Sequence, residues 1–237
     1  MNRIITALVL FLISLNGYSQ TAKEYFLSGG TKHSAKDYKG EIEDYDKAIV
    51  LDPNVDMYIY SRGMAKFCLE NYSAAIEDYN KALKISYNKD FVYHLRGSAK
   101  CKQKNYEGAI EDFDKAIAIN PEYYYAYLSR GTAKDLIKDY NSAIEDFTRA
   151  QAIHPDEKEP YLLRAKSKQN LKDYEGALND YSKFVRMRGN VDLIYYDRGI
   201  CKIALNQKED GCNDLSSASH WDEDKPKVLE AIKKYCK

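Results

Sequence analysis

The residues that could carry out chemistry in this chain are few and widely separated. The sequence contains five cysteines and four histidines, at His33, His94, His154 and His220. A zinc site needs ligands at short, regular spacings, and neither a Cys-x-x-Cys pair nor a His pair at helical spacing occurs. A Gly-rich phosphate loop and a Gly-x-Ser-x-Gly nucleophile turn are also missing from the sequence. We therefore expect no enzymatic activity, no bound metal and no cofactor.

The charge balance argues against nucleic acid as a partner. The chain has 36 basic and 36 acidic residues, so it lacks the basic excess that neutralises phosphates. Hydrophobic residues at 44% and charged residues at 30% are typical of a folded protein with a well-solvated surface. The 22 tyrosines stand out against one tryptophan, and tyrosine serves both half-buried helix seams and binding sites. Composition alone leaves both uses of tyrosine open.

The first nineteen residues predict a secretory signal peptide. Arg3 gives a positive start, and residues 4–15 form an almost unbroken apolar run. Small residues at 17 and 19 precede an expected cut between Ser19 and Gln20. A retained membrane anchor is the alternative, but the apolar run is well short of the ~20 residues that cross a bilayer. We therefore expect export, to the periplasm or alternatively to the extracellular space, with no stable membrane anchor once residues 1–19 are removed.

Small and aromatic residues recur through the rest of the chain with a period of 34 residues. The small residues are Gly29, Gly63, Gly97, Gly131 and Gly199, with Ala165 at the place between the last two. Nine residues after the first five of these places come Tyr38, Tyr72, Tyr106, Tyr140 and Tyr174. Three residues further on come Ala75, Ala109, Ala143 and Ala177, with Glu41 as the exception. A fixed period of this length indicates an array of repeated structural units.

Each 34-residue repeat has the pattern of two antiparallel helices. Within residues 139–152 the apolar and small side chains follow the three- and four-residue spacing of one helix face. An Asp or Asn precedes each such face, where its side-chain oxygen can cap exposed N–H groups. Gly and Ala at the recurring places let the two helices approach closely. One helix pair cannot bury its apolar face alone, so neighbouring repeats must stack.

This pattern resembles the tetratricopeptide repeat. The resemblance rests on the 34-residue period, the recurring Gly and Ala, the Tyr that opens each second helix, and the closing Pro53, Pro121 and Pro155. It implies an all-α fold, a right-handed superhelical solenoid of stacked antiparallel helix pairs whose concave side is lined by first helices. We expect six repeats over residues 22–225, namely 22–55, 56–89, 90–123, 124–157, 158–191 and a divergent 192–225. A C-terminal capping helix at 226–237 is expected to cover the last apolar face.

Charged residues recur in register with the repeats. An Arg stands once in each repeat from the second to the sixth, as in Arg62 and Arg130, and an Asp occupies one place in all six second helices. We expect a ladder in which each carboxylate accepts hydrogen bonds from a guanidinium across a helix seam. Two solvated stripes of charge are the alternative. A Lys that also recurs once per repeat indicates a structural or solvated row rather than an anion site.

Residues peculiar to one or two repeats are better site candidates than recurring ones, and the resemblance places a binding groove at four positions of each first helix. These positions give the groove candidates Phe26, Met57, Tyr60, Met64, Phe67, Phe91, His94, Tyr125 and Leu128, together with His33 and Cys101. In the last two repeats they give Glu159, Leu162, Lys166, Gln169, Leu193, Tyr196, Ile200 and Ile203. Methionine and aromatic side chains can adapt to the apolar anchors of a peptide. The alternative is that several of them pack between adjacent first helices.

The groove lacks one known recognition device of the family. Members that clamp a C-terminal carboxylate do so with Lys and Asn in the first repeat, whereas the matching places here are Phe26 and Gly30. The resemblance therefore favours an apolar anchor over carboxylate recognition. Whether a bound peptide is helical or extended stays open.

Two of the five cysteines are candidates for a disulfide. Cys212 falls in the last repeat helix and Cys236 in the expected cap, elements that should pack together, and an oxidising compartment permits the bond. Two buried thiols are the alternative. Cys68 and Cys101 are a weaker pair, because their places in consecutive first helices differ by one. Cys201 replaces the usual Ala at a tight contact and is expected to be a packed free thiol.

We therefore expect a scaffold or adaptor of the cell envelope that binds a partner peptide or protein in its concave groove. A structural homo-oligomer built from repeat arrays is the main alternative, since open arrays with apolar ends can self-associate. A carbohydrate-binding module is a weaker alternative. Aromatic grooves stack sugars, but the chain has only one tryptophan.

Overall fold

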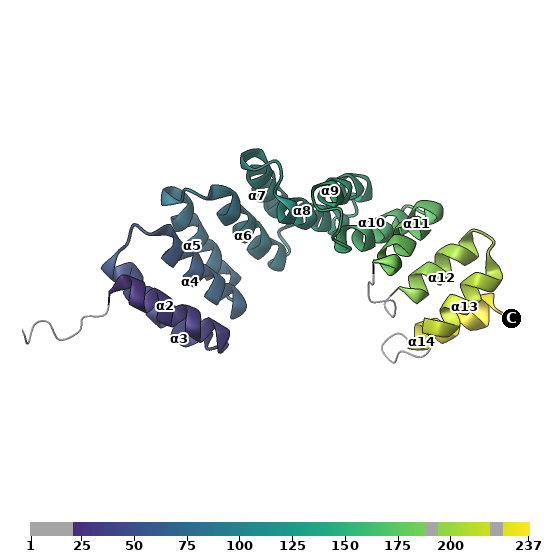
Figure 1. The fold of residues 1–237 in the computed structure, drawn as a ribbon, viewed down its shortest axis with the longest axis horizontal. Coiled ribbons are helices and arrows are strands. Elements are labelled where there is room, and N and C mark those ends of the chain that lie inside the picture. The colour runs from purple at the N-terminus through teal and green to yellow at the C-terminus, as the bar shows by residue number, and fades with distance from the viewer. Residues whose placement is uncertain (1–20, 188–193, 219–224) are drawn as a thin grey trace, which may run out of the picture. The chain divides into compact units, whose positions relative to one another are not determined.

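The computed structural model describes residues 21–187, 194–218 and 225–237, and these residues form helices and turns, with no strand among them (Figure 1). The helices are α2 (Ala22–Ser34), α3 (Tyr38–Leu51), α4 (Asp56–Cys68), α5 (Tyr72–Ile85), α6 (Lys89–Lys102), α7 (Tyr106–Ile119), α8 (Tyr124–Leu136), α9 (Tyr140–Ile153), α10 (Glu159–Asn170), α11 (Tyr174–Arg186), α12 (Tyr195–Ala204), α13 (Lys208–Ala218) and α14 (Lys225–Tyr235). The predicted all-α fold of stacked helix pairs is confirmed. The expected signal peptide at 1–19 and the groove candidate Leu193 lie outside the described residues.

The chain divides into two compact blocks between Ala99 and Lys100, within α6. In the N-terminal block, α2 packs on α3, α4 packs on α5, and α3 contacts α4. In the C-terminal block, α8 packs on α9, α10 on α11 and α12 on α13, while α9 contacts α10 and α11 contacts α12. Each block is therefore a stack of consecutive antiparallel helix pairs.

The turn inside each helix pair has one recurring backbone geometry. A non-glycine residue with φ near +60° ends the turn, at Lys36, Glu70, Lys104, Lys138, Lys172 and Asn206. The residue after it caps the second helix in the first five pairs, as when the Asp139 side chain accepts a hydrogen bond from the Ser142 N–H. The left-handed residue reverses the chain, and the capping oxygen satisfies an N–H that lacks a helical partner.

Glycine on the first helix lets an aromatic ring of the second helix lie directly against its backbone. A Cβ added at Gly63 would stand 2.7 Å from Cε1 of Tyr79, and one added at Gly131 would stand 2.7 Å from Cε1 of Phe147. Both rings are almost fully buried. The recurring Gly therefore belongs to the packing of the helix pair, as the sequence pattern indicated.

The predicted Arg–Asp pairing is confirmed in four repeats, and both partners belong to the same repeat. Bidentate pairs join Arg62 to Asp78, Arg130 to Asp146, Arg164 to Asp180 and Arg198 to Asp214, at 2.6 to 2.9 Å. The recurring Lys of the same repeat binds the same carboxylate at 2.7 to 2.9 Å, as Lys66 does on Asp78 and Lys134 on Asp146. The lysine row is thus structural.

The first repeat replaces this arginine with Ser28. The Ser28 hydroxyl donates to Asp44 at 2.6 Å, and the Lys32 ammonium lies 2.7 Å from the same carboxylate. Burial alone would raise the pKa of Asp44, but the hydrogen bonds from Lys32 and Ser28 outweigh it, and the net effect lowers the pKa below its usual value. The Asp is kept charged in the first repeat by different donors.

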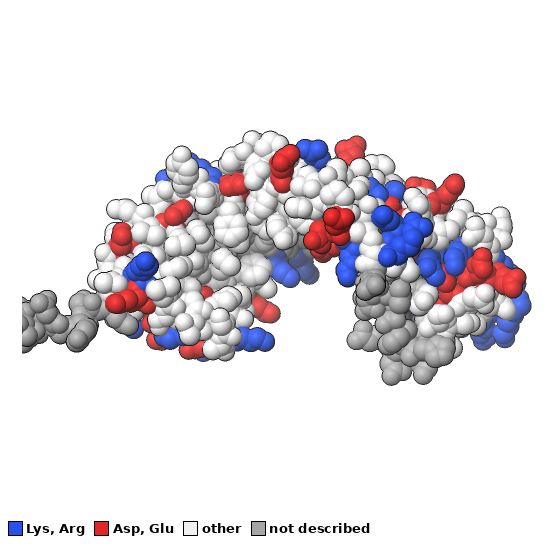
Figure 2. All heavy atoms as spheres, viewed as in Figure 1, with Lys and Arg blue, Asp and Glu red and all other residues white. Residues whose placement is uncertain are grey.

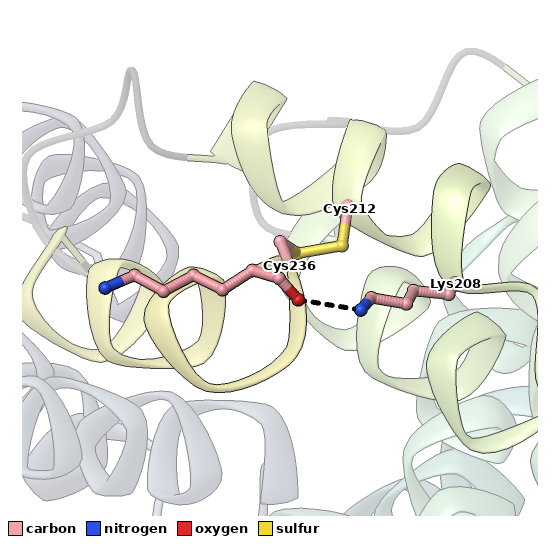
Figure 3. Close-up of a disulfide and its surroundings, with 4 residues drawn as sticks. Lys208, Cys212 and Cys236 are labelled. Carbon is pink, nitrogen blue, oxygen red and sulfur yellow. Dashed lines mark hydrogen bonds between the residues drawn. A yellow bond between two sulfur atoms is a disulfide. The ribbon is translucent and has the colours of Figure 1, made fainter.

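Helix α14 covers the C-terminal end of the array by packing on α13, with Val228 buried. A disulfide joins Cys212 of α13 to Cys236 just after α14, with Cα atoms 5.7 Å apart (Figure 3). The Lys208 ammonium donates to the Lys237 carbonyl at 2.9 Å beside it. Cys201 is a buried free thiol, and the weaker pair, Cys68 with Cys101, is not bonded.

Candidate functional site

Several groove candidates of the N-terminal block are in contact with other aromatic side chains. The ring of Tyr60 on α4 meets the ring of Phe91 on α6 edge-on, with centroids 5.5 Å apart. Phe67 at the end of α4 meets Tyr72 of α5 in the same manner, at 5.2 Å. Tyr60, Met64 and Phe67 pack against the core and still keep part of their surface exposed.

Two candidates of this block differ in accessibility. Phe26 is stacked on Tyr45 of α3, at a centroid distance of 5.5 Å, and lies 5.1 Å from the ring of Tyr58 of α4. It therefore fills a seam between helices and offers only part of its ring. Met57, at the start of α4, keeps 38% of its surface exposed and is the more accessible anchor.

His94 is a half-buried residue of α6. Burial lowers its pKa from 6.5 to about 4, so the imidazole is neutral at physiological pH. Burial also raises the pKa of Tyr60, with the Asp56 carboxylate adding to the effect. His94 and Tyr60 are consequently both neutral at physiological pH.

The groove candidates of α8 in the C-terminal block have opposite environments. Tyr125 is 60% exposed and stands edge-on to the ring of Tyr124 at 5.1 Å. Leu128 is only 8% exposed, so the prediction that it lies in an open groove is wrong. It lies in a core cluster with Phe147 of α9, against which Leu163 of α10 also packs, so it is closed off from a partner.

A cavity of about 200 Å³ opens among α2, α3 and α4 on the N-terminal block. We call it the Glu41 cavity, and its lining consists of Gly30, His33, Glu41, Tyr45, Ser61 and Met64. The Glu41 side chain is only 2% exposed, and its two carboxylate oxygens lie 2.9 and 3.1 Å from Nδ1 of His33. Burial raises the pKa of the neighbouring Tyr45 hydroxyl, and the Glu41 carboxylate adds to the effect. A buried acidic group thus forms one wall of an open cavity.

This cavity exists because the first repeat departs from the others at two places. Where Glu41 stands, the next four repeats have fully buried alanines, Ala75, Ala109, Ala143 and Ala177. Where Gly30 stands, the other repeats have Met64, Ser98, Thr132, Lys166 and Ile200. A Cβ added at Gly30 would meet nothing within 4 Å, so the missing side chain leaves open space. Glu41 is a visible exception in the repeat pattern, and the expectation that non-recurring residues mark sites applies to it.

The described residues contain neither a candidate metal site nor a candidate membrane span. No group of three His, Cys, Asp or Glu side chains among them could hold a metal ion. Within the same residues, no helix has the length and apolar character needed to cross a bilayer. Acidic and basic side chains both occur over the face in view in Figure 2, with no continuous basic surface there.

Comparison with known proteins identifies the repeat. Residues 58–89 and 91–123 each match a family model described as tetratricopeptide repeat. No curated protein matches the chain.

Solved structures share the fold at low sequence identity. PilF of Pseudomonas aeruginosa superposes with a TM-score of 0.77 at 16% identity, covering 90% of this chain and 97% of that one. PilW, described as a type IV pilus biogenesis factor, gives 0.76 at 19% identity, with coverage of 90% and 100%. A tetratricopeptide repeat protein of Parabacteroides merdae gives 0.64 at 20% identity, with coverage of 91% and 84%.

Proposed function

Because this chain is a tetratricopeptide repeat protein, we propose that it is a scaffold or adaptor that binds a segment of a partner protein on the first-helix face of its N-terminal block. Repeats of this kind serve protein–protein interaction, and stacked helix pairs offer extended surfaces for it. Catalysis is not part of the proposal, since the fold is typical of scaffolds.

The observation that carries the proposal is the gathering of adaptable apolar side chains around an open cavity. Met57, Tyr60, Met64 and Phe67 are all partly exposed on α4, and Met64 also lines the Glu41 cavity. Aromatic and methionine side chains beside a pocket are typical anchors of a peptide interface. The matching positions of the fifth repeat are Glu159, Leu162, Lys166 and Gln169, and the Gln169 side chain accepts a hydrogen bond from Tyr181 at 2.7 Å. The fifth repeat thus lacks the aromatic and methionine side chains that α4 presents beside the cavity.

We propose the cell envelope as the place of action. The support is the sequence of residues 1–19, with its positive start, apolar run and small residues before Gln20. Fractionation of cells that express the full chain tests this location. We expect the envelope fraction to hold a protein whose first residue is Gln20, as read by mass spectrometry. Recovery of the full-length chain in the cytoplasmic fraction would contradict it.

Site-specific photo-crosslinking tests the binding role. A benzoylphenylalanine placed at Met57 should yield a discrete adduct with a partner protein, and Tyr60→Ala with Phe67→Ala should abolish the adduct. The same crosslinker at Tyr87, which is fully exposed just beyond α5, serves as the control and should yield none. Equal adducts at both sites would contradict the proposal. An adduct made only of two copies of this chain would favour the homo-oligomer instead.

A further inference from the structure

We infer that the Glu41 cavity recognises a primary ammonium group, carried by the partner as a lysine side chain or a free amino terminus. The inference rests on the proposed function, and it names the chemistry of one subsite within that face. Its basis is a buried carboxylate beside open space, in the one repeat whose sequence departs from the packing pattern at both places.

Glu41 is a buried carboxylate. A buried carboxylate is costly for folding unless it is paired and hydrogen-bonded, and the small Ala found in the next four repeats would avoid that cost. Glu41 nevertheless occupies this place, with its side chain 2% exposed against a cavity of about 200 Å³. A buried carboxylate that borders open space, where the other repeats have a small residue, is better explained by a ligand than by stability.

The Glu41 carboxylate has unused capacity to accept hydrogen bonds. Nδ1 of His33 can donate one hydrogen bond, although it lies within reach of both carboxylate oxygens, at 2.9 and 3.1 Å. A carboxylate offers about four acceptor positions. Glu41 can therefore accept further bonds from a donor in the cavity.

The lysine next to His33 is bound to groups other than Glu41. Lys32 stands beside His33 on α2, but its ammonium is held by the Asp44 carboxylate at 2.7 Å and by the Gly40 carbonyl at 3.2 Å. It is thus committed to the repeat's own framework rather than to Glu41. Among the described residues, the base in contact with Glu41 is the His33 ring, which is a cation only when it is protonated. A permanently charged ammonium is therefore a partner that a ligand would add.

The shape of the cavity favours ammonium over guanidinium. The planar fork of an arginine binds best when both carboxylate oxygens face it together, and His33 already lies against both of them. An ammonium is a compact charge that needs only one free acceptor position on the carboxylate. The Ser61 hydroxyl lines the same cavity and can accept a second bond, while Met64 supplies an apolar wall for the methylene chain.

Titration of the full chain with n-butylammonium chloride, followed by NMR of the Met64 methyl group and the His33 ring, tests the inference. The matched probe is n-butanol, with sodium chloride added to equal ionic strength. We expect saturable shifts of both signals with butylammonium and at least tenfold weaker binding of butanol. Equal binding of the two probes would overturn the inference.

Three variants assign the binding to the cavity. Glu41→Gln removes the charge at nearly constant shape and should weaken butylammonium at least tenfold, whereas Glu43→Gln, on the exposed face of the same helix, should leave it unchanged. Gly30→Met places in the cavity the side chain that the second repeat has there, and should block binding with the charge intact. Unchanged binding by Glu41→Gln, with a native circular dichroism spectrum, would refute the site.

Two peptide arms identify the source of the ammonium. One is a capped peptide with a single lysine, compared with its norleucine analogue, and the other is a lysine-free peptide with a free amino terminus, compared with its acetylated form. A tenfold preference within either pair supports the inference and names the source, and no preference in both pairs overturns it. If the Met57 adduct forms while butylammonium does not bind, only the ammonium site fails. If butylammonium binds through Glu41 while no adduct forms, the proposed function fails and the site stands.

Discussion

Arg130 connects two successive repeats through one guanidinium group. Its Nε and Nη2 donate to the two carboxylate oxygens of Asp146 in the same repeat, at 2.9 and 2.6 Å, while its Nη1 donates to Asp114 of the repeat before, at 2.5 Å. The first carboxylate is 4% exposed and the second 53%. The same side chain therefore makes a buried pair and an exposed pair, which allows the two to be compared directly.

The buried pair should contribute far more to stability than the exposed pair. We expect Asp146→Asn to lower the free energy of unfolding by about 3 kcal/mol, because it leaves a buried guanidinium without its main partner. Asp114→Asn should cost less than about 1 kcal/mol, because water replaces an exposed carboxylate. Urea unfolding measures both. A double-mutant cycle of Arg130→Met with Asp146→Asn should show coupling of about 2 kcal/mol. Equal losses in the two Asp variants would contradict this assignment.

Exchanging the first repeat's Glu with another repeat's Ala should have unequal effects. Ala109→Glu should destabilise the protein by about 3 kcal/mol or more, since Ala109 is fully buried and the His33 position is Cys101 in that repeat. Glu41→Ala should not lower the melting temperature, because it removes a desolvated charge and leaves His33 exposed enough to be hydrated. A large loss in Glu41→Ala would show that the carboxylate is retained for stability rather than for a ligand.

Replacing Gly63 and Gly30 with alanine should change the stability in opposite directions. Gly63→Ala should cost about 2 kcal/mol, because the new Cβ meets the buried ring of Tyr79. Gly30→Ala should raise the free energy of unfolding by about 0.5 to 1 kcal/mol, because alanine favours the helix and the space beside it is open. Thermal unfolding of the two variants measures the difference, and a loss in Gly30→Ala would mean that the cavity is tighter than described.

The disulfide should stabilise the C-terminal helix locally. Closing a loop with a sequence separation of 24 residues is expected to contribute about 3 kcal/mol. Cys236→Ser should therefore speed amide hydrogen exchange in α14 and leave α8 and α9 unchanged, since repeats are held mainly by their neighbours. Cys68→Ser, at an exposed free thiol, is the control and should change neither region. Uniform loss of protection along the chain would argue against a local effect.

Stability should fall as the pH drops from 6.5 towards 4, because of His94. Burial lowers its pKa in the folded state to about 4, whereas the unfolded chain binds the proton near pH 6.5. Protons therefore favour the unfolded state between these two values, and the stability is fully present only above pH 6.5. We expect a loss of about 3 kcal/mol across this window. Urea unfolding of His94→Gln should show a flatter pH profile, and an unchanged slope would refute the assignment.

The recurring features of the fold could be predicted because six copies of one pattern record the same packing. Gly63 and Gly131 recur since each faces a buried ring, and the Arg–Asp pairs recur since both partners belong to one repeat. The accessibility of single side chains was harder to predict. The helical position of Leu128 is that of an accessible residue, but its burial depends on how α9 and α10 close over it.

The Glu41 cavity depends on three helices at once. Its walls come from Gly30 and His33 of α2, Glu41 and Tyr45 of α3, and Ser61 and Met64 of α4. The sequence shows each residue as a local departure or a local match. The sequence pattern does not show that Gly30 and Glu41 border the same space. That arrangement depends on how α4 packs against α2 and α3.

The Arg–Asp pairs also bear on how such a chain can change in length. Each 34-residue segment from the second to the sixth has its own arginine, lysine and aspartate. The arginine also binds one polar side chain sixteen residues upstream, such as Asp46, Asn80, Asp114 or Thr148. Duplication or deletion of a whole segment therefore rejoins compatible partners. A single-residue insertion between an arginine and its aspartate would separate them, so genetic change is expected to proceed in steps of complete repeats.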